Sequence, residues 1–320
     1  MGNRSECVNP ELNLPTPANR KSLLGAPAGA LHGAAPIFWN ERELRAGWRL
    51  AIYFLCFGTL AAGGIYAAVL LHLPQVSRTD PTAGGLFAQE AILMFAAFAA
   101  AAILSLLEGR PFGAYGLPGA VAFGVRFWQG AIWGIAMIAG MILLIRLLGG
   151  FSFGGLALHG SKLWSYAAVW GLVFLCVGFL EEFLFRGYTQ FTLASGIEFW
   201  PAATMLSAVF GAFHLGNTGE DKVGALSVFA IGMFFCLTLR RTGNLWFAVG
   251  LHASFDWGET FLFSVPNSGI VVSGHLLNSS FHGPVWLTGG TVGPEGSVMA
   301  FVVVAAATGI FSRVFPPREE

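Results

Sequence analysis

The chain has 320 residues, of which 55% are hydrophobic and only 11% charged, and its mean hydropathy is +0.67. Soluble domains carry about 25% charged residues, so the composition predicts an integral membrane protein and excludes an ordinary soluble enzyme. The net charge is zero, and the sequence contains no glycine-rich phosphate loop and no zinc-ribbon spacing of Cys and His. We therefore expect no nucleic-acid partner.

The N-terminal segment differs from the rest of the chain. Residues 1–37 form a polar, proline-rich leader, which we expect to be disordered. The first apolar run begins only near Ala46, so we expect no cleavable signal peptide. Residues 38–49 mix aromatic and charged side chains, which is typical of a short interfacial helix. We assign a membrane domain to residues 38–315 and a tail to residues 316–320.

Long apolar stretches follow one another through the membrane domain. A spanning helix needs about 20 largely apolar residues, and this rule predicts an all-α, polytopic transmembrane helix bundle with about eight spans. The expected spans are Ala46–Leu71, Leu86–Leu107, Val121–Leu148, Trp164–Phe185, Phe199–His214, Val223–Leu239, Leu245–Ser264 and Ser297–Phe311.

Arginine and lysine gather in alternate connections between the expected spans. They are more frequent before the first span, after the even-numbered spans and at the C-terminal end than in the other connections. The positive-inside rule then places both termini in the cytoplasm, and we expect a plasma membrane of the bacterial type. We interpret the charges of the turn at residues 108–117 as lying at headgroup level. Residues 266–296 are expected to form a solvated external connection, with a lid over the bundle as the less favoured alternative.

Two adjacent carboxylates, Glu181 and Glu182, end one apolar stretch together with Arg186. An acidic side chain at the centre of a membrane costs about 2.5–3.5 kcal/mol, so such groups are rare and usually functional. Glu182 and Arg186 share a helical face at a spacing of four residues, which is consistent with a structural ion pair in which Arg186 orients Glu182. Glu181 has Phe185 at that spacing, so the pair does not explain why a second carboxylate is present.

Two histidines fall within the expected spans or at their ends. Asp256 follows His252 by four residues, and His214 ends a separate span. Each histidine alone is typical of a satisfied core residue, and Asp256 can simply fix the tautomer of His252. Together with the two glutamates, these groups come from three spans, and we expect them to meet because unpaired polar groups are costly to bury. Glu259 either extends this cluster or faces the external interface, where we also place Glu90.

Three motifs in this order resemble the core of the CPBP family, the CAAX prenyl endopeptidases and the Abi proteins of the bacteriocin-processing type. The motifs are Glu181-Glu182-x-x-x-Arg186, Phe210-x-x-x-His214 and His252-x-x-x-Asp256. The resemblance covers residues 164–264, and it implies an intramembrane endopeptidase that acts on a membrane-associated peptide or protein. It also implies a catalytic site that contains Glu181, Glu182, Arg186, His214, His252 and Asp256.

Hydrolysis in a membrane requires a water, a base and a group that stabilises the oxyanion. In one version, Glu181 and His214 activate the water while His252 and Asp256 organise the oxyanion site. In the other, a metalloprotease version, Glu181, His214 and His252 bind Zn²⁺ and leave one position open for water. The sequence leaves both versions open, so zinc is a conditional cofactor.

Two other classes of function also stay open. A non-catalytic membrane scaffold, or a bacteriocin self-immunity factor, would keep the fold without using the site and would tolerate Glu181→Gln. An ion- or proton-coupled transporter would have repeated halves and broken helices, and the sequence has no internal repeat. The expected partners are the bilayer and the peptide or protein substrate, while the oligomeric state and any prenyl group on the substrate are left open.

Overall fold

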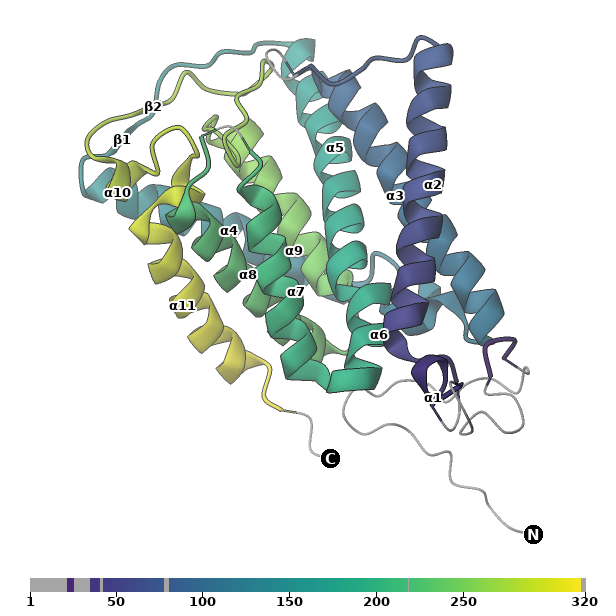
Figure 1. Cartoon of the computed structure of the whole chain (residues 1–320). Helices are drawn as coiled ribbons and strands as arrows, with labels where there is room; N and C mark the ends of the chain where they lie inside the picture. Colours follow the sequence, from purple (N-terminus) through teal and green to yellow (C-terminus); the bar gives the residue numbers. More distant parts are fainter. Residues whose placement is uncertain (1–21, 26–34, 41–42, 78–80, 218, 318–320) are drawn as a thin grey trace.

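Long helices stand side by side in the protein, as a computed structural model of the chain shows (Figure 1). The structure describes residues 22–25, 35–40, 43–77, 81–217 and 219–317. The α-helices are α1 (Ala35–Phe38), α2 (Ala46–Leu70), α3 (Ala83–Glu108), α4 (Val125–Leu147), α5 (Ser161–Arg186), α6 (Tyr188–Ile197), α7 (Phe199–His214), α8 (Lys222–Thr242), α9 (Trp246–Trp257), α10 (Val285–Thr288) and α11 (Val298–Val314). The short elements are η1 (Phe112–Tyr115), η2 (Gly119–Val121), β1 (Phe151–Ser152), the π-helical turn η3 (Gly258–Leu262), β2 (Ser280–Phe281) and η4 (Pro294–Gly296).

All eight stretches that we expected to cross the membrane are largely helical, and the described residues contain almost no sheet. Five helices are long and apolar enough to span a bilayer, namely α2, α3, α4, α5 with its continuation α6, and α8. The apolar helix α11 is shorter, and α7 and α9 have 16 and 12 residues. The all-α membrane bundle is confirmed, while the count of eight crossings stays a prediction.

The first and last long helices reach the same end of the bundle, where α2 begins and α11 ends (Figure 1). The side of the membrane at which this end lies stays a prediction. Most of the expected leader and the last three residues of the tail lie outside the described residues. Residues 22–25 are described, and the Leu23 amide donates to the carbonyl oxygen of Leu107 at 2.8 Å.

The connection at residues 266–296 covers the opposite end of the bundle, where β2 pairs with β1 in an antiparallel ladder (Figure 1). We expected this connection to be solvated, and that expectation is wrong for part of it. Val272 is buried against Trp170 and Phe261, and the Trp170 indole donates to the carbonyl oxygen of Gly274 at 3.1 Å. Apolar side chains of the connection cover the end of α5 and the turn η3, which would otherwise be exposed.

Glycines bring α4 and α9 into close contact. Gly130 of α4 lies against the backbone of Phe247, and Gly250 of α9 lies against the backbone of Phe127, so a Cβ at either position would overlap the facing carbonyl group. Gly134 repeats the contact one turn after Gly130. Small residues at a spacing of four allow membrane helices to approach closely. This contact fixes the position of α9, which carries two of the predicted site residues.

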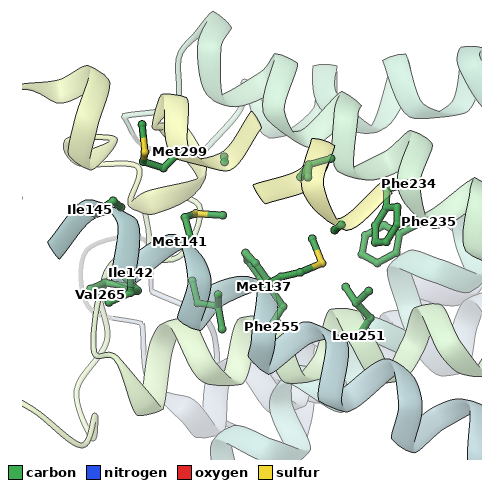
Figure 2. Close-up of a cluster of buried hydrophobic side chains, with 14 of the residues drawn as sticks. Met137, Met141, Ile142, Ile145, Phe234, Phe235, Leu251, Phe255, Val265 and Met299 are labelled. Atoms are coloured by element: carbon green, nitrogen blue, oxygen red, sulfur yellow. The ribbon is translucent and has the colours of Figure 1, made fainter. Parts of the chain in front are cut away.

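Apolar side chains fill the space beside this contact (Figure 2). The cluster includes Met137, Met141, Ile142 and Ile145 of α4, Phe234 and Phe235 of α8, Leu251 and Phe255 of α9, Val265, and Met299 of α11. Phe235 and Phe255 also form part of the cavity wall described below. Because protein interiors are close-packed, the core holds this wall in one position.

A buried ion pair joins the first helices. The Arg49 guanidinium of α2 donates from Nε and Nη2 to the two carboxylate oxygens of Glu108, at 3.0 and 2.7 Å. The hydroxyls of Tyr115 and Tyr188 each donate to the same carboxylate at 2.6 Å. We expected Glu108 at headgroup level, and instead both charged groups are buried, because four donors replace the water that the carboxylate loses.

Gly130→Ala should lower the free energy of unfolding by about 1–3 kcal/mol, the usual cost of overpacking, because the new Cβ meets the backbone of Phe247. The melting temperature of the full chain in detergent measures the effect. Gly140→Ala is the matched control in the same helix, since no atom lies within 4 Å of its Cβ position. Equal melting temperatures for the two variants would contradict the close contact of α4 with α9.

Candidate active site

A cavity of about 310 Å³ lies among α3, α5, α7, α8 and α9. Glu181, His214, His252 and Asp256 line it, and they come from α5, α7 and α9. Apolar side chains of α5 and α8 contribute to the remaining wall, together with polar side chains of the connection at residues 266–296. The cavity therefore holds a polar group of side chains inside an apolar bundle.

The His252 imidazole lies between three carboxylates. Its Nδ1 is 2.9 Å from Oε1 of Glu182, while its Nε2 is 3.6 Å from Oε2 of Glu181 and 3.5 Å from Oδ2 of Asp256. The ring stacks on Phe235, with 5.2 Å between centroids and 16° between planes. An ionised carboxylate can only accept, so Nδ1 carries the proton toward Glu182. Nε2 is thereby directed toward Glu181 and Asp256.

Glu182 and Arg186 form a fully buried ion pair behind the cavity. Nη1 of Arg186 donates to Oε1 of Glu182 at 3.2 Å, and both side chains are 0% exposed. The guanidinium lies over the rings of Phe210 and Phe235, at 4.3 and 5.2 Å from their centroids, which adds cation–π attraction. A Cβ at Gly232 would lie 2.6 Å from Nη2 of Arg186, so this glycine leaves room for the guanidinium.

The two adjacent glutamates face different surroundings. Successive residues of an α-helix are turned by about 100°, and here Glu182 points into the packed interior while Glu181 is 27% exposed and lines the cavity. Glu182 is therefore engaged in the structure by Arg186 and His252. Glu181 is the carboxylate that a water or a substrate in the cavity can reach.

His214 ends α7 at the cavity wall. Its Nδ1 lies 2.8 Å from the carbonyl oxygen of Phe210, one turn earlier, and its ring packs edge to face on the Phe210 ring at 4.7 Å. The carbonyl oxygen only accepts, so Nδ1 carries the proton and Nε2 is the ring nitrogen that can accept from a water. The spacing of Phe210 and His214 thus has a physical basis, because Phe210 orients the imidazole and also packs on Arg186.

The six predicted site residues lie at this cavity or directly behind it. Within the described ranges, no group of three or more His, Cys, Asp and Glu side chains is placed to hold a metal ion. The Nδ1 atoms of both histidines are engaged, with Glu182 and with a backbone carbonyl, which leaves Nε2 of each ring available to a ligand. Zinc binding by Glu181, His214 and His252 stays a prediction from the sequence.

Sequence reasoning missed two further acids of the cavity wall. Glu90 of α3 lines the cavity and interacts electrostatically with Glu181. We expected Glu90 at the membrane interface, and that expectation is wrong. An acid inside an apolar stretch was the signal that could have found it. Glu295 enters from the connection before α11, and its Oε2 accepts from the amide and the hydroxyl of Ser268 at 3.0 and 2.7 Å. No local pattern marked Glu295, because it lies in a loop.

Two more carboxylates lie near the cavity. Glu259 is 0% exposed on the turn η3, and neither of its carboxylate oxygens has a hydrogen-bond partner within the described residues. Of the two positions expected for Glu259, in the acidic cluster or at the external interface, the structure shows the first, because Glu259 lies near Asp256 and Glu295. Glu220, in the loop before α8, lies near His214 and Glu295, and burial raises the pKa of its carboxyl group above the ordinary value.

Residues 162–258 match a family model described as type II CAAX prenyl endopeptidase Rce1-like. The matched segment runs from α5 to the end of α9 and contains all six predicted site residues. The match confirms the resemblance to the CPBP family for this part of the chain. Together with the apolar helices, it supports an integral membrane protein of a protease family. No curated protein matches the chain, and no solved structure does.

Glu182→Gln should lower the free energy of unfolding by about 3–5 kcal/mol, because it removes one partner of a buried ion pair and leaves Arg186 uncompensated. Thermal unfolding in detergent measures the loss. Glu198→Gln is the matched control, since Glu198 is exposed and its side chain does not cap α7; surface changes usually stay within about 0.5 kcal/mol. A Glu182→Gln variant as stable as this control would show that the ion pair is not needed for folding.

Proposed function

We propose that this protein is an intramembrane endopeptidase that hydrolyses a peptide bond with a water activated by Glu181. One observation carries the proposal: Glu181, His214, His252 and Asp256 come from three helices and line a single cavity of about 310 Å³. A water occupies about 30 Å³ of liquid, so the cavity has room for water and for part of a peptide. The match to the Rce1-like family supports the same reaction class.

Glu181 and His214 are assigned to the water. Glu181 is the accessible carboxylate of the adjacent pair, and Nε2 of His214 is left free of the backbone bond made by Nδ1. Both groups can accept a proton from a water held between them, and general-base catalysis of this kind typically contributes about 10²–10⁴-fold to the rate. Glu181 is the base, and His214 holds the water in line with the carbonyl carbon.

His252 is assigned to the oxyanion. In its protonated form it donates from Nε2 to the carbonyl oxygen of the substrate as that oxygen gains negative charge. Glu182 and Asp256 act through His252, since Glu182 holds Nδ1 and Asp256 lies 3.5 Å from Nε2. Arg186 acts one step further away, because it neutralises Glu182. Glu182, Arg186 and Asp256 are therefore positioning residues.

The reaction balances with these groups alone. The water oxygen bonds to the carbonyl carbon as one of its protons passes to Glu181, and the carbonyl oxygen becomes an oxyanion that accepts from His252. The C–N bond then breaks, and the proton on Glu181 passes to the leaving nitrogen, which departs as an amine. The apolar wall restricts bulk water, which strengthens each electrostatic contact in the cavity.

The substrate is assigned to membrane-associated peptides or proteins. The cavity is formed by helices that span a bilayer and by the connection that covers one end of them. A peptide that reaches it must be close to the membrane or inserted in it. Any prenyl group on the substrate is outside this proposal.

Glu181→Gln, His214→Ala and His252→Ala should each reduce peptide cleavage by about 10³-fold or more, because each removes a group that contacts the water or the oxyanion. Cleavage of membrane-derived peptides by the purified protein in detergent or liposomes, followed by mass spectrometry, measures the rates. Glu198→Gln should cleave like the unmodified protein. Full activity in one of the three variants would remove that residue from the mechanism, and no cleavage by the unmodified protein would favour the scaffold or immunity alternative.

Chelation separates the glutamate mechanism from the zinc version. The glutamate mechanism needs no ion, so the cleavage rate should be unchanged after dialysis against a strong zinc chelator and unchanged again when Zn²⁺ is restored. A loss on chelation that Zn²⁺ reverses would overturn this version in favour of metal-activated water. Metal analysis of the purified protein provides an independent measurement.

A further inference from the structure

The carboxylates of the cavity outnumber the cationic groups beside them. Glu90, Glu181, Asp256 and Glu295 line it from α3, α5, α9 and the connection before α11. None of the described lining residues is lysine or arginine, and only two imidazoles accompany the four acids. The nearby Arg186 is already paired with Glu182, behind the wall.

The same molecule shows how it compensates a buried carboxylate that serves structure alone. Glu108 accepts from Arg49 at both oxygens and from two tyrosine hydroxyls. In contrast, the side chain of Glu90 accepts from the neighbouring side-chain amide of Gln89, at 3.3 Å, and forms no ion pair with a described residue. The acids at the cavity have few donors, although a group removed from water needs them.

A fifth acidic side chain, behind the cavity wall, also lacks a partner. Glu259 is 0% exposed, neither of its oxygens has a hydrogen-bond partner within the described residues, and it lies beside Asp256 and Glu295. It belongs to the turn η3, a π-helical insertion that directly follows α9, and such insertions are frequent at functional sites. Glu181 and Asp256 thus share the imidazole of His252, while Glu90, Glu259 and Glu295 have no cationic partner among the described residues.

We propose that the cavity selects peptides that carry a lysine or arginine side chain close to the scissile bond, so that the substrate supplies the missing cation. This inference rests on the proposed endopeptidase function and names the substrate class of that site. The apolar part of the wall, which includes Trp170, Phe174 and Val228, contacts the hydrophobic part of the peptide, as it would the stem of a lysine. Glu90 and Glu295 determine the specificity, and Glu181 remains the base.

The test uses fluorescent apolar decapeptides with amidated C-termini, in which one position at a time carries lysine, norleucine or glutamate. At low salt, we expect the best lysine peptide to be cleaved about tenfold faster than its norleucine counterpart, and the glutamate peptide to be cleaved most slowly. The preference should weaken at high salt, because salt screens charges. Equal rates for lysine and norleucine at every position would overturn the proposal.

Two variants locate the preference within the cavity. Glu90→Gln and Glu295→Gln keep an acceptor for any local hydrogen bond and remove one charge each, so the ratio of lysine to norleucine cleavage should fall in both. Glu198→Gln, which is exposed and far along the chain from these acids, should leave the ratio unchanged. A ratio that stays the same in both cavity variants would contradict the assignment.

Binding separates this proposal from the endopeptidase function. Fluorescence anisotropy with the His214→Ala protein, which keeps every carboxylate, measures peptide affinity without turnover. Tighter binding of lysine peptides together with no cleavage by the unmodified protein would support cation selection and overturn the proposed hydrolysis. Cleavage with no difference in rate or in affinity would leave the hydrolysis in place and overturn cation selection.

Discussion

The buried carboxylate of Glu182 sets the arrangement of the site. A charge without water must be neutralised and hydrogen-bonded inside the protein, and among the described residues Glu182 is paired with Arg186 and His252. The pairing with His252 brings α9 to α5 and turns the imidazole so that Nε2 faces the cavity. The pairing with Arg186 fixes the guanidinium between two phenylalanine rings. Glu182 and Arg186 of α5 thus contact side chains of α7, α8 and α9, directly or through one another.

Aromatic rings and glycines make this arrangement possible. Phe210 and Phe235 hold Arg186, and they also pack on His214 and His252 respectively. The glycines of α4 and α9 allow their backbones to approach, which places His252 at the depth of Glu182. In a bilayer, helix association depends on close packing and on hydrogen bonds more than on the hydrophobic effect. Both kinds of interaction converge on α9.

The carboxylate of Glu108 and the acids of the cavity differ in how fully their oxygens are hydrogen-bonded. The Arg49–Glu108 pair is closed, since every carboxylate oxygen has donors from the chain itself. The acids at the cavity and behind it are less fully bonded: Glu181 is partly exposed, and Glu259 has no hydrogen-bond partner within the described residues. Perturbed and incompletely compensated charges cluster at functional sites, and this contrast identifies the cavity as the region where a substrate can complete the charge balance.

The amino-acid sequence by itself determined the membrane class, the helical segments and the pairs at a spacing of four, such as Glu182 with Arg186 and Phe210 with His214. These features depend on composition and on the 3.6-residue period within one helix. Only the tertiary structure decided that Glu181 faces the cavity while Glu182 faces inward, that Glu90 and Glu295 join the wall, and that Glu108 is buried. The reason is physical: the direction of a side chain depends on which face of its helix meets a neighbour, and that is set by contacts between segments far apart in the chain.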